Sequence, residues 1–222
     1  MPKVSEQYLE DKKNQIMDCA WELMREIPLY RITMRDIIKK LGCSQGLIYR
    51  YYQSVDEIYA NLMNREIQDM DFKSRIAAIL QKEEKPEIII AQLFQELGKY
   101  MIEVQQKLGG KFFYELQVEY AFDEEKKREL LSTLLYKQNM VYFQEHILAY
   151  IGEQLQKRVL RLKKPTLSIK KLAVFAGAAI DGIGNYAALT GRDNVMAIQE
   201  EILELFALLS SQMISCLCGD TE

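Results

Sequence analysis

Histidine occurs only once in the 222 residues, as His146, so the chain cannot form a catalytic or zinc site that needs two or more histidines. Cysteine is also scarce: Cys19, Cys43, Cys216 and Cys218 are scattered, and free thiols are expected instead of a disulfide framework. The pair Cys216 and Cys218 lacks a second ligand pair, and a frayed helix end is its simpler interpretation. No glycine-rich phosphate loop follows a strand. The sequence therefore predicts no enzyme, no metal site and no cofactor.

Long apolar runs are missing as well, and the chain has only four prolines. No segment approaches the roughly 18 apolar residues of a membrane-spanning helix. The beginning, MPKVSEQYLEDKK, lacks the apolar stretch of a signal peptide. We therefore expect a cytoplasmic protein without a membrane partner. With 49% hydrophobic and 27% charged residues, the chain has enough apolar material for one large or two small domains.

Helical periodicity, by contrast, is present almost everywhere. Apolar residues recur at spacings of three and four, and no segment shows the period of two that is typical of a strand. The sequence predicts an all-α fold of about nine helices. Residues 1–53 are expected to form a three-helix N-terminal domain and residues 54–222 a second helical domain.

The helices of the first part have clear start and stop signals. The first is expected over Glu6–Ile27. Thr33 can cap a second helix that Gly42 ends, because glycine tolerates a left-handed backbone. Ser44 can cap a third helix, and Ser54 a fourth. The second and third helices are each expected to have about eight or nine residues, joined by about three.

The later helices are longer. The polar segment QKEEKPE (81–87) is interpreted as a linker in which Pro86 starts a helix reaching about Leu108, where Gly109 and Gly110 break it. Further helices are expected over about 111–120, from Asp123 toward Arg161 with a break near Gly152, and over 168–189 and 193–217.

Charge is distributed unevenly along the chain. The segment from Arg31 to Arg50 has a local balance of +4, whereas the whole chain has a net charge of -3, which leaves -7 for the rest. An acidic body with one basic segment is typical of a protein that meets a polyanion with one end. Ordinary solvated helix faces would also account for this pattern.

Residues 33–52, TMRDIIKKLGCSQGLIYRYY, have the spacing of a helix-turn-helix unit, whose second helix enters the major groove of DNA. On that second helix, Ile48 and Tyr52 are four apart and can anchor it in the core. Gly46 has no side chain, so the backbone can approach a nucleic acid closely. Thr33 and Ser44 place hydroxyls and amide groups at helix starts, where phosphate oxygens are commonly bound.

These residues resemble the helix-turn-helix signature of the TetR family of transcriptional regulators over about residues 12–63. The quoted positions are Thr33, Ile37, Gly42, Cys43, Ser44, Gly46, Ile48, Tyr49, Tyr51 and Tyr52. The resemblance implies an all-helical homodimer with an N-terminal DNA-binding domain and a C-terminal domain that binds a small molecule. Val55 stands where the family commonly has lysine, so that phosphate contact would fall to Lys39, Lys40 or Arg50.

The resemblance also implies roles for single residues. Thr33 and Ser44 would bind phosphate, Gln45 and Gly46 would approach bases, and Tyr49 and Tyr51 would contact the DNA backbone or a thymine methyl. The complete set of expected DNA-binding residues is Thr33, Arg35, Lys39, Ser44, Gln45, Gly46, Leu47, Tyr49, Arg50 and Tyr51.

The second half is unusually rich in aromatic residues, which can form a core or line a cavity. Aromatic walls with a few polar groups suit a small, flat, largely apolar and possibly cationic effector. The expected effector-binding residues are Tyr100, Phe113, Tyr114, Tyr120, Tyr136, Met140, Phe143, His146, Asp181 and Asn185. His146 could equally have a purely structural role.

The last two predicted helices, about 168–217, combine small and apolar residues, which allow close helix packing. We interpret them as a homodimer interface. A twofold axis would place the two helix-turn-helix units of the dimer on the two halves of a palindromic DNA operator. The sequence thus predicts a repressor released by an effector. A DNA-binding helical adaptor controlled by a protein partner, or an activator, remains the alternative.

Overall fold

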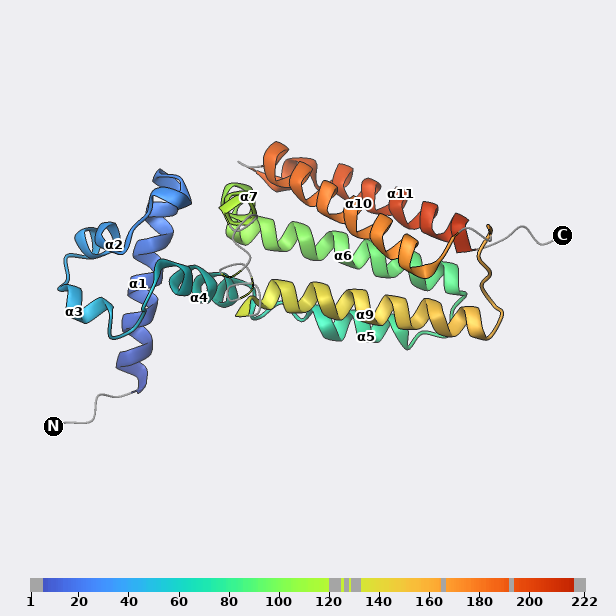
Figure 1. The fold of residues 1–222 in the computed structure, drawn as a ribbon, viewed down its shortest axis with the longest axis horizontal. Helices are drawn as coiled ribbons and strands as arrows, with labels where there is room; N and C mark the ends of the chain where they lie inside the picture. Colours follow the sequence, from blue (N-terminus) through green and yellow to red (C-terminus); the bar gives the residue numbers. More distant parts are fainter. Residues whose placement is uncertain are drawn as a thin grey trace. The chain divides into compact units, whose positions relative to one another are not determined.

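The computed structural model describes residues 6–119, 125, 128, 133–164, 167–191 and 194–217 (Figure 1). Within these ranges the regular structure is helical and no strand occurs, which confirms the predicted all-α class. The chain forms two compact units. Unit 1 consists of residues 1–68 and 115–135, and unit 2 of residues 69–114 and 136–222. The functional boundary expected after residue 53 stays a prediction.

Unit 1 is built around α1, which packs against α2 and α4. Its elements are α1 (Glu6–Glu26), the short 3-10 helix η1 (Leu29–Arg31), α2 (Met34–Leu41), α3 (Gln45–Ile48) and α4 (Val55–Ile67). The side chains that fill its core are Ile16, Ala20, Ile37, Ile48, Ile58 and Leu62, each at most 1% exposed. Ile48 and Tyr52 are thereby confirmed as core residues.

Three of these helices agree with the sequence, and α3 does not. It is four residues long instead of eight or nine. After Ile48 the chain continues in turns, in which the N–H of Arg50 and that of Tyr51 donate to the carbonyls of Leu47 and Ile48. These tighter bonds replace further α-helical turns because the chain must reach Ser54, whose hydroxyl accepts the N–H of Glu57 and caps α4.

Unit 2 consists of longer helices. They are α5 (Phe72–Leu80), α6 (Pro86–Leu108), the first half of α7 (Gly110–Glu119), α9 (Leu135–Gln156), α10 (Ile169–Thr190), the 3-10 helix η2 (Val195–Ile198) and α11 (Gln199–Leu217). α6 lies against α11, and α11 lies against α10 (Figure 1). α6 has the predicted bounds. α5 was not predicted as a separate helix, because QDMD (68–71) contains neither glycine nor proline. α9 continues through Gly152 without the expected break.

The packing of α6 on α11 requires a residue without a side chain. A Cβ added to Gly98 would lie 2.8 Å from Cδ2 of Phe206 and 3.3 Å from a methyl of Leu203. Gly98 therefore lets the two helices approach closely, as small residues at helix crossings do. This contact brings α6 and α11 close together within unit 2.

One helix, α10, corrects an expectation from the sequence. It has 22 residues and a mean hydropathy of 1.4 over its most apolar window, which is long and apolar enough to cross a membrane, although no such segment was predicted. A third of that window is buried within the protein, and Asp181 and Asn185 interrupt it. The apolar character of α10 is divided between a face packed on α6 and α11 and an exposed face.

Candidate nucleic-acid interface

The start of α2 is organised by a reciprocal pair of hydrogen bonds between Thr33 and Asp36. The hydroxyl of Thr33 accepts the N–H of Asp36, and the carboxylate of Asp36 accepts the N–H of Thr33 at 2.9 Å. The same hydroxyl donates to that carboxylate at 2.6 Å, and these bonds lower the pKa of Asp36. Because the hydroxyl of Thr33 donates its proton to Asp36, that hydroxyl is not available as a donor to phosphate. The start of α2 can therefore bind a phosphate mainly through its first backbone N–H groups.

The turn between α2 and α3 leaves Ser44 available. Gly42 adopts the predicted left-handed conformation (φ 67°, ψ 30°) and its N–H donates to the carbonyl of Ile38. Ser44 occupies the position before α3 with an extended backbone, but its side chain makes no capping hydrogen bond. The exposed hydroxyl of Ser44 is therefore free to bind a group outside the protein.

The two faces of α3 and of the turns after it differ in chemistry. Ile48 and Tyr52 point into the core, whereas Gln45, Gly46, Tyr49 and Arg50 are exposed. Leu47 and Tyr51, which were also predicted to bind DNA, are half-buried. A Cβ added to Gly46 would meet no atom within 4 Å, so the protein itself does not require glycine there.

Two adjacent lysines of α2 have different surroundings. The ammonium group of Lys40 forms ion pairs with Glu26 at 3.0 Å and Glu22 at 3.3 Å, both on α1. The hydrogen bond from Glu26 raises the pKa of Lys40. Lys39 and Arg35 are exposed, and the structure shows no ion pair for either among the described residues. Lys39 and Arg35 can thus contact a polyanion, whereas Lys40 fastens α2 to α1.

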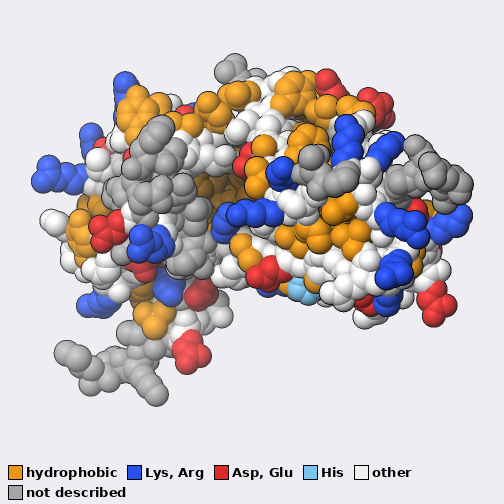
Figure 2. Space-filling view, turned by 45° about the vertical axis from the view of Figure 1, so that its right-hand side comes forward, with side chains coloured by type: hydrophobic (Ala, Val, Ile, Leu, Met, Phe, Trp, Pro, Cys, Tyr) orange, Lys and Arg blue, Asp and Glu red, His pale blue; other side chains and the backbone are white. Residues whose placement is uncertain are grey.

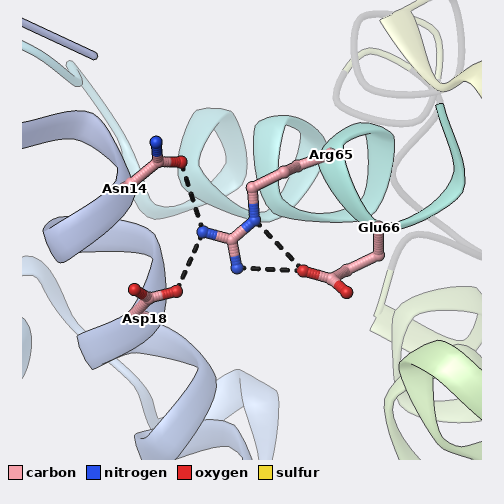
Figure 3. A network of polar contacts seen from close by, with 4 residues as sticks. All are labelled: Asn14, Asp18, Arg65 and Glu66. Atoms are coloured by element: carbon pink, nitrogen blue, oxygen red, sulfur yellow. Dashed lines mark hydrogen bonds and ion pairs between the residues drawn. The ribbon is translucent and has the colours of Figure 1, made fainter. Parts of the chain in front are cut away.

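A polar network that the sequence did not indicate joins α4 to α1 (Figure 3). The guanidinium group of Arg65 lies 2.8 Å from the carboxylate of Asp18 and donates to the side-chain oxygen of Asn14 at 3.3 Å. It also contacts the carboxylate of Glu66 at 2.9 Å. These contacts, together with the apolar core, fix α4 against α1.

Two further contacts of unit 1 fix η1. The hydroxyl of Tyr59 on α4 donates to the carbonyl of Leu29 at 3.3 Å, and burial raises the pKa of Tyr59. The N–H of Leu29 donates to the carboxylate of Glu115, in the second half of α7, at 3.0 Å. Sequence reasoning could not find these pairs because their members are 30 and 86 residues apart.

The predicted effector-binding residues are only partly brought together. Tyr100 stacks on Phe72 (4.2 Å between ring centroids) and lies near Tyr136 (6.1 Å), whose ring meets that of Phe113 edge-on at 5.1 Å. Phe143 lies 6.3 Å from Phe72 between ring centroids and meets Phe94 edge-on at 5.8 Å. Four of the predicted aromatic residues therefore share one cluster inside unit 2.

The other predicted effector residues vary in position. His146 stacks on Tyr142 at 3.8 Å, and its Nδ1 lies 2.8 Å from the carbonyl of Tyr142, which is a local contact within α9. Tyr114, Met140 and Asn185 are half-buried, and Asp181 is exposed. Tyr120 lies outside the described residues.

Polar groups accompany the aromatic cluster. Asn139 is buried and donates to the hydroxyl of Tyr100 at 2.8 Å, while burial raises the pKa of Tyr100 to about 12. Gln105 is 2% exposed and donates to the carbonyl of Gly184 at 3.1 Å. Neither amide was predicted. A signal for Gln105 existed, because it occupies a core position of the stripe formed with Met101, Val104 and Leu108.

Comparison with known proteins agrees with this geometry in the N-terminal part. Residues 16–62 match the family described as bacterial regulatory proteins, tetR family. Over 83 residues, or 37% of this chain, the sequence is 29% identical to an HTH-type transcriptional repressor of Mycobacterium tuberculosis. That match covers 41% of the repressor's own length.

Solved structures are similar over nearly the whole chain. A TetR transcription regulator from Haloarcula marismortui has a TM-score of 0.61 at 18% identity, covering 94% of this chain and 99% of that one. A TetR-family regulator from Mesorhizobium loti has a TM-score of 0.63 at 12% identity, covering 95% and 98%.

FadR from Bacillus subtilis, solved in complex with stearoyl-CoA, has a TM-score of 0.52 at 16% identity, covering 87% of this chain and 96% of FadR. At these identities the solved structures establish the fold. The matched N-terminal segment and the fold together confirm the resemblance predicted from the sequence: the chain carries the helix-turn-helix domain of the TetR family of transcriptional regulators.

Proposed function

We propose that this protein is a homodimeric repressor that binds a palindromic DNA operator and is released by a small effector. The observation that carries the proposal is the exposed tip of α3. There the free hydroxyl of Ser44 lies beside the exposed residues Gln45 and Gly46, and the exposed cations Arg35 and Lys39 follow the start of α2. Such a tip combines phosphate contacts, which position the protein, with groups that can reach base edges.

Most of the predicted DNA-binding residues keep their roles within the proposal. Ser44 and the first amides of α2 bind phosphate, Gln45 and Gly46 approach bases, and Tyr49 contacts the sugar-phosphate backbone or a thymine methyl. The exposed side chains of Arg35, Lys39 and Arg50 add positive charge. Leu47 and Tyr51 are half-buried and support the exposed residues of α3 by packing. A protein of this kind works where the chromosome is, which in a bacterial cell is the cytoplasm.

Exposed apolar residues on the two last helices support the dimer. Val174 (66% exposed), Phe175 (49%) and Leu189 (55%) on α10, with Leu208 (59%) on α11, present apolar surface without a partner in the single chain. Figure 2 shows hydrophobic side chains at the surface among charged groups. Apolar surface of this kind commonly marks an interface, and a twofold axis would place two recognition helices about 34–36 Å apart on DNA.

The dimer is tested by introducing a charge. Leu208→Asp should convert the protein to a monomer in sedimentation velocity experiments, because the carboxylate would be buried without a partner at the interface. Val159→Asp is the matched control, since Val159 is 56% exposed and lies outside α10 and α11. A variant Leu208→Asp that remains a dimer would contradict the proposed interface.

Release by an effector requires that the ligand binds two conformations with different affinity, and DNA binding weakens by that difference and no more. The aromatic cluster of unit 2 is the proposed binding region. FadR from Bacillus subtilis, which has the same fold, holds stearoyl-CoA, and this supports a role for unit 2 in binding a largely apolar molecule.

The route from effector to DNA is proposed to run through α4. Unit 1 contains the second half of α7 and the start of α9, and each makes a hydrogen bond there: Glu115 with Leu29, and Leu135 with Asn64. The next residues along the chain toward unit 2 are Tyr114 and Tyr136, both predicted effector residues. A ligand that displaces Tyr114 or Tyr136 would shift the adjacent backbone, which is hydrogen-bonded to Leu29 and Asn64 in unit 1.

The central experiment selects an operator from a random duplex library with the purified protein and measures affinity by fluorescence anisotropy. We expect an inverted repeat, and a loss of about 1–3 kcal/mol with Tyr49→Ala if the ring contacts a base. Ser44→Ala should weaken binding to all duplexes alike, whereas the exposed Ser74→Ala on α5 should not. Recovery of no enriched sequence would contradict the proposal.

The alternatives make different predictions. A helical adaptor would bind the same operator but respond to a protein instead of to small molecules. An activator would bind DNA identically and raise transcription in a reconstituted reaction with RNA polymerase. The similarity to a mycobacterial repressor favours repression.

A further inference from the structure

Positive charge gathers at one end of unit 2, in the connection between α9 and α10 and in the first turn of α10. The segment 157–171 contains no aspartate or glutamate and has a local charge of +7, which exceeds the +4 of the segment 31–50. Pro165 and Thr166 of this segment lie outside the described residues. We call its seven cations the basic end. All of them are exposed: Lys157, Arg158, Arg161, Lys163, Lys164, Lys170 and Lys171.

Hydrogen bonds fix the backbone that carries the basic end. The N–H of Arg161 donates to the carbonyl of Leu217 at 2.8 Å, and the N–H of Lys163 donates to the carbonyl of Cys216 at 3.0 Å. Both carbonyls belong to the last turn of α11. Leu160 is 1% exposed and anchors the connection in the core. The basic end therefore lies where α9 and α11 end and α10 begins (Figure 1), and Figure 2 shows Lys and Arg side chains gathered on that side of the unit.

Three of these cations occupy positions that the stability of the fold does not favour. Arg158 follows α9 with a left-handed backbone (φ 58°), and the N–H of Val159 reaches back to the carbonyl of Gln154. Glycine commonly occupies such a position, because a side chain there costs free energy. Lys170 and Lys171 lie in the first turn of α10, where the helix dipole favours acidic side chains over cations. These cations are present despite a local cost, which favours a role outside the fold.

The neighbouring acids in the sequence do not balance the basic end. Lys157 forms an ion pair with Glu153 on the preceding turn of α9. Asp220 and Glu222 lie outside the described residues, and if both of them and Glu153 are set against the seven cations, a surplus of four positive charges remains. The rest of the chain has a net charge of -10, because the whole has -3 and the segment 157–171 has +7. Such a separation of charge directs one end of a protein toward a polyanionic surface.

Aliphatic side chains are interleaved with these cations. Val159 is 56% exposed, and Leu162, Leu167 and Ile169 are half-buried, so that part of each remains at the surface. A surface that binds duplex DNA instead places hydroxyl and amide groups beside its cations, as the tip of α3 does. Cations together with exposed aliphatic groups match the surface of an anionic bilayer, because the headgroups attract the charges and the aliphatic groups enter the layer below them.

We propose that the basic end binds the surface of a bilayer that contains anionic lipids. Its cations meet the lipid phosphates, and Val159 reaches between the headgroups. Contact with a bilayer surface needs no spanning helix, so the lack of long apolar runs, from which no membrane partner was expected, does not exclude it. The exposed apolar residues Val174 and Phe175 remain part of the proposed dimer interface. The lipid contact goes beyond the proposed function and depends on neither the operator nor the effector.

Co-sedimentation with sucrose-loaded vesicles measures this contact. We expect the full chain to bind vesicles of phosphatidylglycerol and phosphatidylcholine in equal parts, and not vesicles of phosphatidylcholine alone. Binding should weaken as salt is added, because salt screens the attraction between exposed charges. Each cation near an anionic bilayer changes the partition coefficient roughly fivefold, so the loss of four cations should lower it by at least about a hundredfold.

Two variants of equal net charge separate the location of the cations from their number. The test variant combines Arg158→Gln, Arg161→Gln, Lys164→Gln and Lys170→Gln. The control variant removes four exposed lysines elsewhere on unit 2, through Lys85→Gln, Lys99→Gln, Lys107→Gln and Lys137→Gln. A third variant, Val159→Ser, keeps all charges and should weaken vesicle binding several-fold, because it removes the aliphatic group. Melting temperatures and sedimentation velocity verify that each variant keeps the fold and the oligomeric state of the wild type.

Vesicle binding that the test variant loses and the control variant keeps, with operator affinity unchanged in both, supports the proposal. No binding by the wild type, or an equal loss in the two variants, would overturn it and leave the DNA-binding repressor intact. A short duplex without the operator serves as a competing probe. If the test variant loses affinity for that duplex and not for vesicles, the basic end binds nucleic acid and the lipid contact is refuted.

Discussion

The side chain of Asn64 accepts the N–H of Leu135 at 2.8 Å, and it donates to the carbonyl of Thr133 at the same distance. One amide on α4 therefore holds the chain on both sides of the point where α9 begins. Leu135 is the first residue of α9, so Asn64 satisfies an N–H that has no acceptor within its own helix.

Asn64→Ala should lower the free energy of unfolding by about 1 kcal/mol, the usual cost of losing a helix cap. Urea denaturation of the two proteins measures this difference. The matched control is Asn61→Ala, because Asn61 on the same helix bonds, among the described residues, only to the carbonyl of Glu57 within α4. Equal losses of unfolding free energy in the two variants would show that the hydrogen bonds of Asn64 to the start of α9 stabilise the protein no more than a bond within α4 does.

Gly46→Ala should leave the protein as stable as before or raise its free energy of unfolding, by up to about 1 kcal/mol, because alanine favours helix and no atom obstructs its methyl. Operator affinity should fall, since the proposal places the backbone at Gly46 against the bases. Gly152→Ala in α9, where an added methyl also meets nothing, is the control. Thermal unfolding and anisotropy titrations measure both effects, and unchanged affinity would remove Gly46 from the interface.

Lys39→Gln and Lys40→Gln should act differently although the residues are adjacent. Replacing Lys39 should reduce the log-log slope of operator affinity against salt by roughly 0.9 for each phosphate that the protein no longer neutralises. Replacing Lys40 should change the slope little and destabilise unit 1 only slightly, as expected for an exposed ion pair. Titrations at several salt concentrations decide the matter, and identical slopes for the two variants would contradict the assignment.

The Thr33 and Asp36 pair should make stability depend on pH. Because the pKa of Asp36 is lowered in the folded state, its contribution is complete above the unfolded value of roughly 3.9 and is lost as pH falls through the folded pKa. Asp36→Asn removes this titration. The difference in unfolding free energy between wild type and Asp36→Asn should therefore shrink below about pH 4. Urea titrations between neutral and acidic pH provide the comparison, and a constant difference would contradict the assigned shift.

Tyr52→Phe should stabilise the protein. The hydroxyl of Tyr52 is buried and has no hydrogen-bond partner among the residues that the structure describes, and burial raises its pKa to about 12. Removing the oxygen relieves that cost while the ring remains packed, so we expect a gain of about 1 kcal/mol in the free energy of unfolding. Chemical denaturation measures it. A destabilised variant would mean that the hydroxyl has a partner in solution, such as a trapped water molecule.

The local signals in the sequence were sufficient for most helix boundaries of the first part. Ser54 and Gly42 act through hydrogen bonds within a few residues of themselves, so their types alone indicate a start and an end. The short length of α3 depends on where Ile48 and Tyr52 meet the core, and this is decided by tertiary packing. The absence of glycine and proline at 68–71 likewise hid the break before α5.

The site was predictable as a set of residue types but not as a set of partners. The sequence could not show that Lys40 binds Glu22 and Glu26 while Lys39 stays exposed, because the choice depends on the crossing of α2 over α1. Four of the aromatic residues expected around an effector do cluster, yet Gln105 was missed. Its position in an apolar stripe was the available signal, since a polar side chain buried there loses its contacts with water and needs a hydrogen-bond partner.

The brevity of α3 has an energetic consequence for recognition. With four helical residues, the segment that we propose to face DNA is less ordered by its own backbone than a helix of two full turns would be. If the duplex extends the helix through Tyr49 and Arg50, part of the gross binding free energy is spent on immobilising that backbone, and the heat capacity of association becomes more negative than for a rigid docking surface. Discrimination between sequences would then arise partly from how completely each duplex induces folding at its surface.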